Sequence, residues 1–182
     1  MKKVFCFAVL CLGVFWTGIS AQTSAGGLEI SFGFKRQTGF STNQFAVWIE
    51  DNRGNFVKTL YATKFTASGG WSKRPQSIPL WVSRSGLSGL DKKDIDAFSG
   101  ATPRTGTISY RWDGTDKNGN NVAPGEYRVL LEATLKEDTK VLYSSPFTLG
   151  GSSTEAELRP DYSGSRTKER DMIENVKISY RP

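Results

Sequence analysis

The sequence contains no histidine, and its two cysteines, Cys6 and Cys11, lie close to the N-terminus. A Ser-His-Asp triad and a histidine-bound zinc are therefore excluded. If the N-terminal segment is removed on export, as argued next, the mature chain also has no disulfide and no thiolate nucleophile. No pair of carboxylates stands out in a single motif, which disfavours a hydrolase. We therefore expect a protein that is not an enzyme and whose fold rests on its own hydrophobic core.

The first apolar run, from Val4 to Phe15, is too short for a transmembrane helix. It follows two lysines and is followed by a small-residue site at Ala21, which is the order of a secretory signal peptide. We expect residues 1–21 to be a signal peptide and residues 22–182 to be a single exported domain, periplasmic or otherwise extracytoplasmic. An uncleaved anchor is the alternative.

Charge of either sign is not concentrated anywhere in the chain. The formal net charge is +6, and the 24 Lys and Arg residues are spread along the sequence with 18 Asp and Glu residues between them. Nucleic-acid binding requires basic residues clustered on one face. We therefore expect a solvated surface and no nucleic-acid partner.

Alternating apolar residues predict about seven short strands with turn signals between them, the pattern of an antiparallel β-sandwich. No sustained helical periodicity is present. The Asp51-Asn52-Arg53-Gly54 segment predicts a hairpin turn between two of the strands. The strands are expected over residues 28–34, 45–50, 56–61, 107–112, 127–133, 141–149 and 172–180.

Two segments interrupt this pattern. Residues 64–104 form a long insertion that is rich in Ser, Gly and basic residues but also contains Trp71 and Trp81. A connection of this length is functional or disordered, and the tryptophans argue for order. We expect the insertion to pack on one end of the sandwich. Residues 150–169 predict a flexible connection before the last strand.

The Trp112–Tyr127 segment contains Trp-Asp-Gly, Asn-Gly and Pro-Gly steps in that order. It resembles the hairpin of Ig-like domains in the flagellar hook-capping protein and in many exported modules. This resemblance implies an all-β fold, an Ig-like antiparallel β-sandwich with a long loop insertion. Asp116, Asn118 and Asn120 alternate, so the segment is either a plain turn or, as an alternative, a calcium loop.

A longer pattern resembles the predicted periplasmic protein family known as domain of unknown function 2271. The resemblance implies partners of the membrane flavin-transferase and PepSY types. It rests on Val47–Asp51, Phe56–Leu60, Trp71, Asp96–Pro103, Trp112–Gly114 and Pro124–Gly125.

The Asp96–Thr102 segment, Asp-Ala-Phe-Ser-Gly-Ala-Thr, resembles the acceptor motif of the bacterial FAD:protein FMN transferase, Asp-x-x-Ser/Thr-Gly-Ala-Ser/Thr. That enzyme esterifies FMN through its phosphate onto the last residue of the motif. The resemblance implies an exported electron-transfer module with FMN covalently attached to Thr102. The alternative is a cofactor-free periplasmic Ig-like binding or scaffold domain.

Each residue of the motif has an expected role under this resemblance. Thr102 supplies the attacking hydroxyl, and Gly100 and Ala101 let the transferase pocket close around the backbone because they lack bulk. Ser99 holds the turn through a local hydrogen bond. Asp96 lies near the transferred phosphate, through the metal ion of the transferase.

Neighbouring aromatic and basic residues have two interpretations each. The aromatic residues either stack on the isoalloxazine ring or form the core of the insertion. The basic residues either pair with the flavin phosphate or are solvated surface charges. The aromatic candidates are Trp71, Trp81 and Phe98, and the basic ones are Lys73, Arg74 and Arg104.

Overall fold

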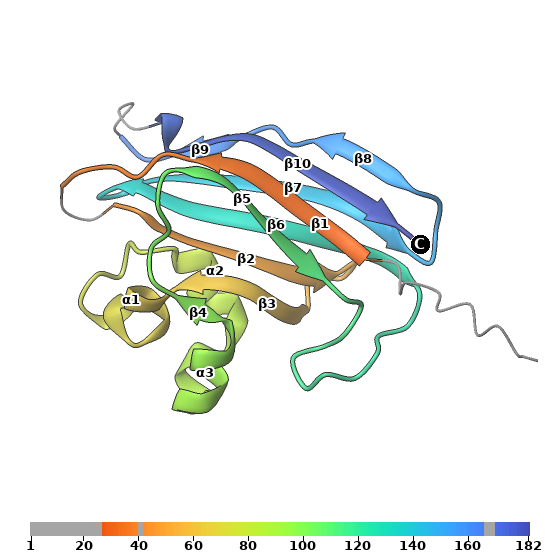
Figure 1. Cartoon of the computed structure of the whole chain (residues 1–182). Helices are drawn as coiled ribbons and strands as arrows, with labels where there is room; N and C mark the ends of the chain where they lie inside the picture. The colour runs from red at the N-terminus through yellow and green to blue at the C-terminus, as the bar shows by residue number, and fades with distance from the viewer. Residues whose placement is uncertain (1–26, 40–41, 166–169) are drawn as a thin grey trace, which may run out of the picture.

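Two β-sheets pack face to face in the computed structural model, which describes residues 27–39, 42–165 and 170–182 (Figure 1). The first sheet has the order β5-β1-β10-β8, and the second has the order β4-β3-β2-β6-β7-β9. Neighbouring described strands are antiparallel except for the pair β3–β4. The fold is therefore the expected all-β sandwich. The strands are β1 (Gly27–Phe34), β2 (Gln44–Asp51), β3 (Phe56–Thr63), β4 (Ser99–Gly100), β5 (Gly106–Trp112), β6 (Gly125–Lys136), β7 (Thr139–Leu149), β8 (Thr154–Glu157), β9 (Asp161–Ser163) and β10 (Ile173–Arg181).

The core between the sheets follows from the alternation in the sequence. On β1, Leu28, Ile30 and Phe32 are buried, and the residues between them lie on the other face of the sheet. Each such side chain contributes about 1.5–3 kcal/mol when it is fully buried. Strand β2 is buried on both faces, because Val47 faces this core and Trp48 packs under the insertion.

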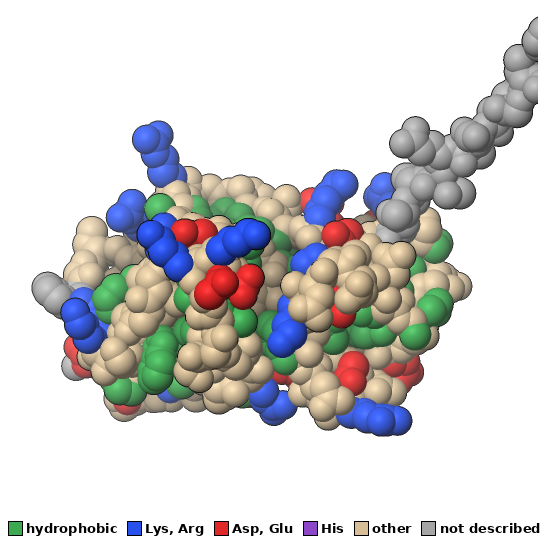
Figure 2. Space-filling model, turned by 90° about the horizontal axis from the view of Figure 1, so that it is seen from below, with side chains coloured by type: hydrophobic (Ala, Val, Ile, Leu, Met, Phe, Trp, Pro, Cys, Tyr) green, Lys and Arg blue, Asp and Glu red, His purple; other side chains and the backbone are tan. Residues whose placement is uncertain are grey.

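The insertion differs from the expected loop. It forms short helices that cover the outer face of the second sheet rather than one end of the sandwich, and α3 hangs below β3 in Figure 1. The apolar outer-face residues of β2, β3 and β6 explain this position, because they need a cover. The elements of the insertion are α1 (Lys64–Ala67), η1 (Gly70–Ser72), α2 (Pro79–Ser85), η2 (Leu87–Gly89) and α3 (Lys92–Phe98), followed by β4. On this face, basic and acidic side chains are interspersed with hydrophobic ones (Figure 2).

Buried polar groups of the second sheet hold the insertion in place. The carboxylate of Glu132 accepts hydrogen bonds from the backbone N–H of Leu80 at 3.2 Å and of Trp81 at 2.8 Å. Burial raises the pKa of Glu132, and these two N–H groups oppose the shift. Thr134 Oγ1 accepts from the backbone N–H of Ile78 at 2.9 Å. The first turn of α2 is thus tied to β6.

The two predicted turns have the same construction. Asp51 Oδ1 accepts from the backbone N–H of Asn55, and Asp116 Oδ1 accepts from that of Asn120. Gly119 has φ of +84°, which glycine adopts without strain. Backbone hydrogen bonds, the one from Asn120 foremost, lower the pKa of Asp116. The Asp116 carboxylate therefore stabilises a turn in this segment through hydrogen bonds to backbone N–H groups.

The segment over residues 150–169 contains more structure than expected. Strand β8 pairs with β10, and β9 pairs with β7, so the segment closes one edge of each sheet. Residues 166–169 lie outside the described residues, and so does the expected signal peptide. A short helix, η3 (Arg170–Met172), precedes β10. Within the described ranges, no helix has the length and apolar character needed to cross a membrane.

Candidate functional site

The motif over residues 96–102 wraps around one edge of the second sheet. It begins on α3, whose first turn is capped by the Asp91 side chain accepting from the backbone N–H of Asp94 at 2.8 Å. It continues through β4, the edge strand beside β3, and ends in the connection to β5, the edge strand of the other sheet. The motif therefore starts on the outer face of the second sheet. It ends where the chain crosses to the first sheet, between the edge strands β4 and β5 (Figure 1).

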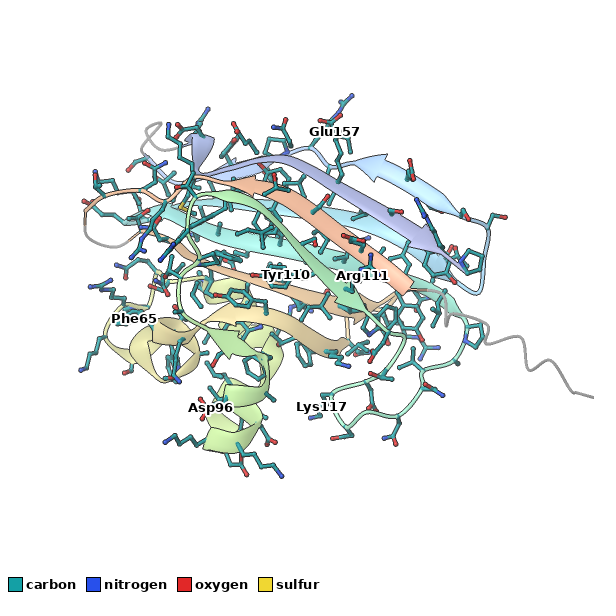
Figure 3. All side chains as sticks on the ribbon, viewed as in Figure 1. Phe65, Asp96, Tyr110, Arg111, Lys117 and Glu157 are labelled. Atoms are coloured by element: carbon teal, nitrogen blue, oxygen red, sulfur yellow. The ribbon has the colours of Figure 1, made fainter. Side chains whose placement is uncertain are left out.

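Asp96 lies at the outer-face end of the motif. Its side chain is exposed on α3, and its Oδ1 is 3.2 Å from Lys64 Nζ (Figure 3). No hydrogen bond joins Asp96 to Thr102 in the described structure, so the fold does not by itself bring the two together. This ion pair is exposed and contributes little stability.

Ser99 does not have its expected role. It pairs through its backbone with Ala62 on β3, and its Oγ atom is buried without a hydrogen-bond partner in the described part of the chain. The expected local hydrogen bond is therefore absent among these residues. A short strand pairing holds this part of the motif instead.

Gly100 and Ala101 are held by Tyr61, a residue that the sequence analysis did not identify. Tyr61 Oη lies 2.8 Å from the carbonyl oxygen of Ala101 and 3.2 Å from that of Gly100 and donates to this pair of acceptors. A Cβ atom on Gly100 would lie 2.9 Å from Tyr61 Cε2, so glycine is required by this contact. Tyr61 occurs in an ordinary strand pattern, and only the β3–β4 register connects it to the motif.

Thr102 follows in the irregular connection between β4 and β5. Its side chain is half-buried, and its hydroxyl makes no hydrogen bond to any described residue. A hydroxyl in this position is available to a second protein, because no intramolecular bond has to be broken first.

The three predicted aromatic candidates, of which Phe98 is part of the motif, all pack in the cluster under the insertion. Trp81 is fully buried, its Nε1 donates to Thr59 Oγ1 at 3.0 Å, and its ring meets Phe98 edge-on at 6.0 Å. Trp71 and Phe98 are partly buried and pack against the same cluster. Trp81 is thus core of the insertion, the second of its two interpretations. Among the basic candidates, the Arg74 guanidinium lies 4.6 Å from the ring centroid of Phe65.

An aromatic stack lies under the end of the motif, between the two sheets. The rings of Tyr61 and Tyr110 stack with centroids 4.8 Å apart, and Phe45 stacks on Tyr61 at 5.0 Å. Figure 3 shows Tyr110 on the side of β5 that faces the second sheet. Burial raises the pKa of Tyr61 to about 12, and burial together with the charge of Tyr61 raises that of Tyr110 further. Both phenols therefore remain protonated at neutral pH.

A cleft of about 270 Å³ opens on the outer face, between α3, β3 and the turn that follows β5. Phe56, Leu90 and Phe98 form its apolar wall, and Lys58 and Lys117 are among its polar residues. This cleft can accept a small, partly apolar ligand.

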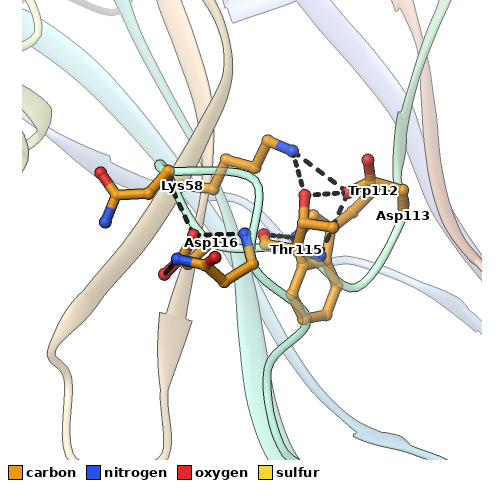
Figure 4. A network of polar contacts seen from close by, with 7 residues as sticks. Lys58, Trp112, Asp113, Thr115 and Asp116 are labelled. Carbon is orange, nitrogen blue, oxygen red and sulfur yellow. Dashed lines mark hydrogen bonds and ion pairs between the residues drawn. The ribbon is translucent and has the colours of Figure 1, made fainter.

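The polar side of this cleft is fixed by one network of contacts. The Lys58 ammonium donates to Asp113 Oδ1 at 3.1 Å and also bonds Thr115 (Figure 4). Burial pushes the pKa of Asp113 upward, but hydrogen bonds from Thr115 and Lys58 outweigh it, and the pKa lies below its ordinary value. Lys58 is therefore held in place as a partner of Asp113.

One comparison with known proteins gave a match. A family model described as "Predicted periplasmic protein (DUF2271)" matches residues 27–165, which include the insertion and the whole motif. The chain matches none of the curated proteins and none of the solved structures. The description of the family supports the expected extracytoplasmic location. Because the match covers most of the sequence, the chain belongs to this family of predicted periplasmic proteins, DUF2271.

Proposed function

We propose that this protein is an exported electron-transfer module that carries FMN esterified to Thr102. The observation that carries the proposal is the Asp96–Thr102 acceptor sequence, which ends in a half-buried threonine whose hydroxyl makes no hydrogen bond to another described residue. The hydroxyl lies on an irregular connection at the edge of the sandwich, where another protein can approach it.

The attachment step is a phosphoryl transfer from FAD. Thr102 Oγ1 attacks the phosphorus on the FMN side of the FAD pyrophosphate, and a new P–O bond forms. The P–O bond to the AMP half breaks, AMP leaves, and the threonine proton is lost. When bound, FMN supplies one- and two-electron transfer. Tyr61 keeps the acceptor backbone in place next to Thr102 through its two carbonyl contacts.

Two partners follow from this proposal. A FAD:protein FMN transferase attaches the cofactor, and Asp96 meets the transferred phosphate within the site of that enzyme. A membrane redox partner of the PepSY type exchanges electrons with the loaded protein.

The test is co-expression with an active flavin transferase, followed by intact-mass measurement. The wild type is expected to gain the mass of FMN less one water. Thr102→Ala is expected to lose this gain, and Thr102→Ser to retain it, because serine also ends the motif. Thr105→Ala is the matched control, because Thr105 lies on the same connection and its Oγ1 only accepts from the Arg36 N–H. An unmodified wild type beside a labelled control substrate would refute the proposal.

A cofactor-free binding domain is a second candidate function, and the outer-face cleft favours it. Its apolar wall and Lys117 suit a small aromatic anion. The folded, unmodified protein is then expected to enhance the fluorescence of the anionic dye anilinonaphthalene sulfonate. Lys117→Glu is expected to weaken this binding, and Lys177→Glu on the other sheet is the charge control. An absence of enhancement would contradict the candidate.

A further inference from the structure

The insertion accounts for the whole net charge of the chain once the expected signal peptide is removed. Residues 64–104 contain seven Lys and Arg and three Asp, a net charge of +4. Residues 22–182 also have a net charge of +4, because the other two charges of the full chain belong to Lys2 and Lys3. The rest of the domain, with 15 basic and 15 acidic residues, is therefore neutral. The basic residues of the insertion are Lys64, Lys73, Arg74, Arg84, Lys92, Lys93 and Arg104.

Basic residues of neighbouring elements meet on one side of the insertion. The ion pair of Lys64 with Asp96 joins α1 to α3. Lys92 lies one helical turn before Asp96, so it is on the same side of α3. Lys73 ends η1, the element that packs on α1, and both Lys73 and Lys92 are exposed. The surface formed by α1, η1 and α3 is therefore rich in accessible positive charge.

An exposed aromatic ring belongs to the same surface. Among the large hydrophobic residues that the structure describes, Phe65 on α1 is the exposed one, at 38% (Figure 3). The Arg74 guanidinium lies 4.6 Å from its ring centroid, and a Cβ atom on Gly70 would lie only 2.7 Å from Phe65 Cε1. Trp71, the residue after Gly70, is half-buried. The Phe65 ring is thus fixed at the surface by its contacts with η1 and the segment after it.

We propose that the surface formed by α1, η1 and α3 docks the protein on an anionic lipid membrane. Anionic headgroups attract basic residues near the surface, and they do so without a fixed geometry for each pair. An aromatic ring surrounded by cations suits the boundary between headgroups and acyl chains. Because the rest of the domain is neutral, the electrostatic field orients the insertion toward such a membrane. A periplasmic location, which the description of the family gives, brings the protein close to membranes.

A lipid surface fits these residues better than an acidic protein does. The aromatic residues that dominate a protein interface lie near its centre in well-packed pockets of the partner. Here one ring projects beside basic residues that are dispersed over several short elements. Dispersed charge with a single apolar anchor matches a fluid layer of headgroups rather than a rigid complementary face.

Co-sedimentation with lipid vesicles tests the inference. It uses the exported protein, with an intact mass that shows the apolar run from Val4 to Phe15 to be absent, because that run would itself bind lipid. The protein is expected to bind vesicles of phosphatidylcholine and phosphatidylglycerol in equal parts severalfold better than vesicles of phosphatidylcholine alone. This preference is expected to disappear in about 1 M salt, where the Debye length is about 3 Å.

Two sets of variants locate the binding surface. Lys73→Glu combined with Lys92→Glu is expected to weaken binding to the anionic vesicles by at least about tenfold, because each basic residue near the membrane contributes to the attraction. Phe65→Ser is expected to weaken it severalfold, and Phe65→Trp to retain it, since tryptophan also suits the interface. Urea unfolding checks that each variant is folded.

Lys177→Glu combined with Arg159→Glu is the matched control, because it changes the net charge equally outside the insertion. Lys177 is exposed on β10, on the outer face of the first sheet, so it lies on the opposite side of the sandwich. This control is expected to bind like the wild type. Equal binding of the wild type to both kinds of vesicle would overturn the inference and make an acidic protein the candidate partner.

The inference is also overturned if the double Lys73 and Lys92 variant or Phe65→Ser binds like the wild type, or if the control loses as much binding as that double variant. No flavin takes part in the measurement, so its outcome is independent of the proposed function.

Discussion

At the scale of single residues, Tyr61 joins the sandwich to the segment that ends in Thr102. Its ring is stacked between the two sheets, and its hydroxyl contacts two successive carbonyl groups of that segment. The position of Thr102 therefore depends on a side chain that belongs to the core.

Replacing Gly100 by alanine tests this dependence. The new Cβ would lie 2.9 Å from Tyr61 Cε2, and the Tyr61 ring cannot move aside freely because Phe45 and Tyr110 stack on it. We expect Gly100→Ala to lower the free energy of unfolding by about 1–3 kcal/mol, the usual cost of overpacking. Urea unfolding measures it. Gly89→Ala is the control, since no atom lies within 4 Å of its Cβ position. Equal stability of the two variants would contradict the contact.

The residues of the motif were predictable from the sequence, but their environment was not. Thr102 and Gly100 follow from a local pattern of seven letters. The contact with Tyr61 depends on the register of β4 against β3, and the sequence does not encode that register in any local signal. The same register buries Ser99 Oγ without a partner, against the prediction of a local hydrogen bond.

At the scale of elements, the insertion is a cover for the outer face of the second sheet. Its short helices are stabilised by packing on Trp48 and Leu130 rather than by helix propensity, because isolated helices of this length are unstable in water. Glu132 supplies much of the polar attachment, since its two oxygens accept the first N–H groups of α2.

Glu132→Gln is expected to destabilise the protein. An amide has only one oxygen, so its NH2 group would face the N–H of Leu80 or Trp81 and leave it unsatisfied, at a cost of about 1–3 kcal/mol. Thermal and urea unfolding measure the loss. Glu126→Gln, on the exposed face of the same strand, is expected to change stability little. If both variants match the wild type, Glu132 does not anchor the insertion.

The elements were predicted unevenly, for a physical reason. The seven main strands each contain several alternating residues, so periodicity identified them, and their bounds differ from the predicted ones by a few residues. Helices α2 and α3 span seven residues each, which is too short for a repeating apolar stripe. Strands β4, β8 and β9 are shorter still, and they exist because a neighbouring strand offers them an edge.

At the scale of the whole molecule, buried tyrosines connect the stability of the sandwich to pH. Tyr61 has its pKa raised to about 12, and the pKa values of Tyr110 and Tyr143 are raised further, with burial as the first cause in each case. In an unfolded chain a tyrosine titrates near pH 10. Between about pH 10 and 12 the folded protein therefore holds protons that the unfolded chain has released.

The free energy of unfolding is thus expected to be constant up to about pH 9.5 and to fall steeply as the pH rises from 10 to 12, because stability falls with pH wherever the native state binds more protons. Lys35, paired with Asp171, shifts in the same direction, so the contribution of tyrosine has to be isolated with a variant. Tyr143→Phe loses the 3.0 Å hydrogen bond to the Ile173 carbonyl and is less stable at every pH. Its stability is expected to fall less between pH 10 and 11 than that of the wild type. Urea unfolding at pH 8, 9, 10 and 11 measures both slopes, and parallel curves for the two proteins would show that the Tyr143 phenol does not contribute to the alkaline loss.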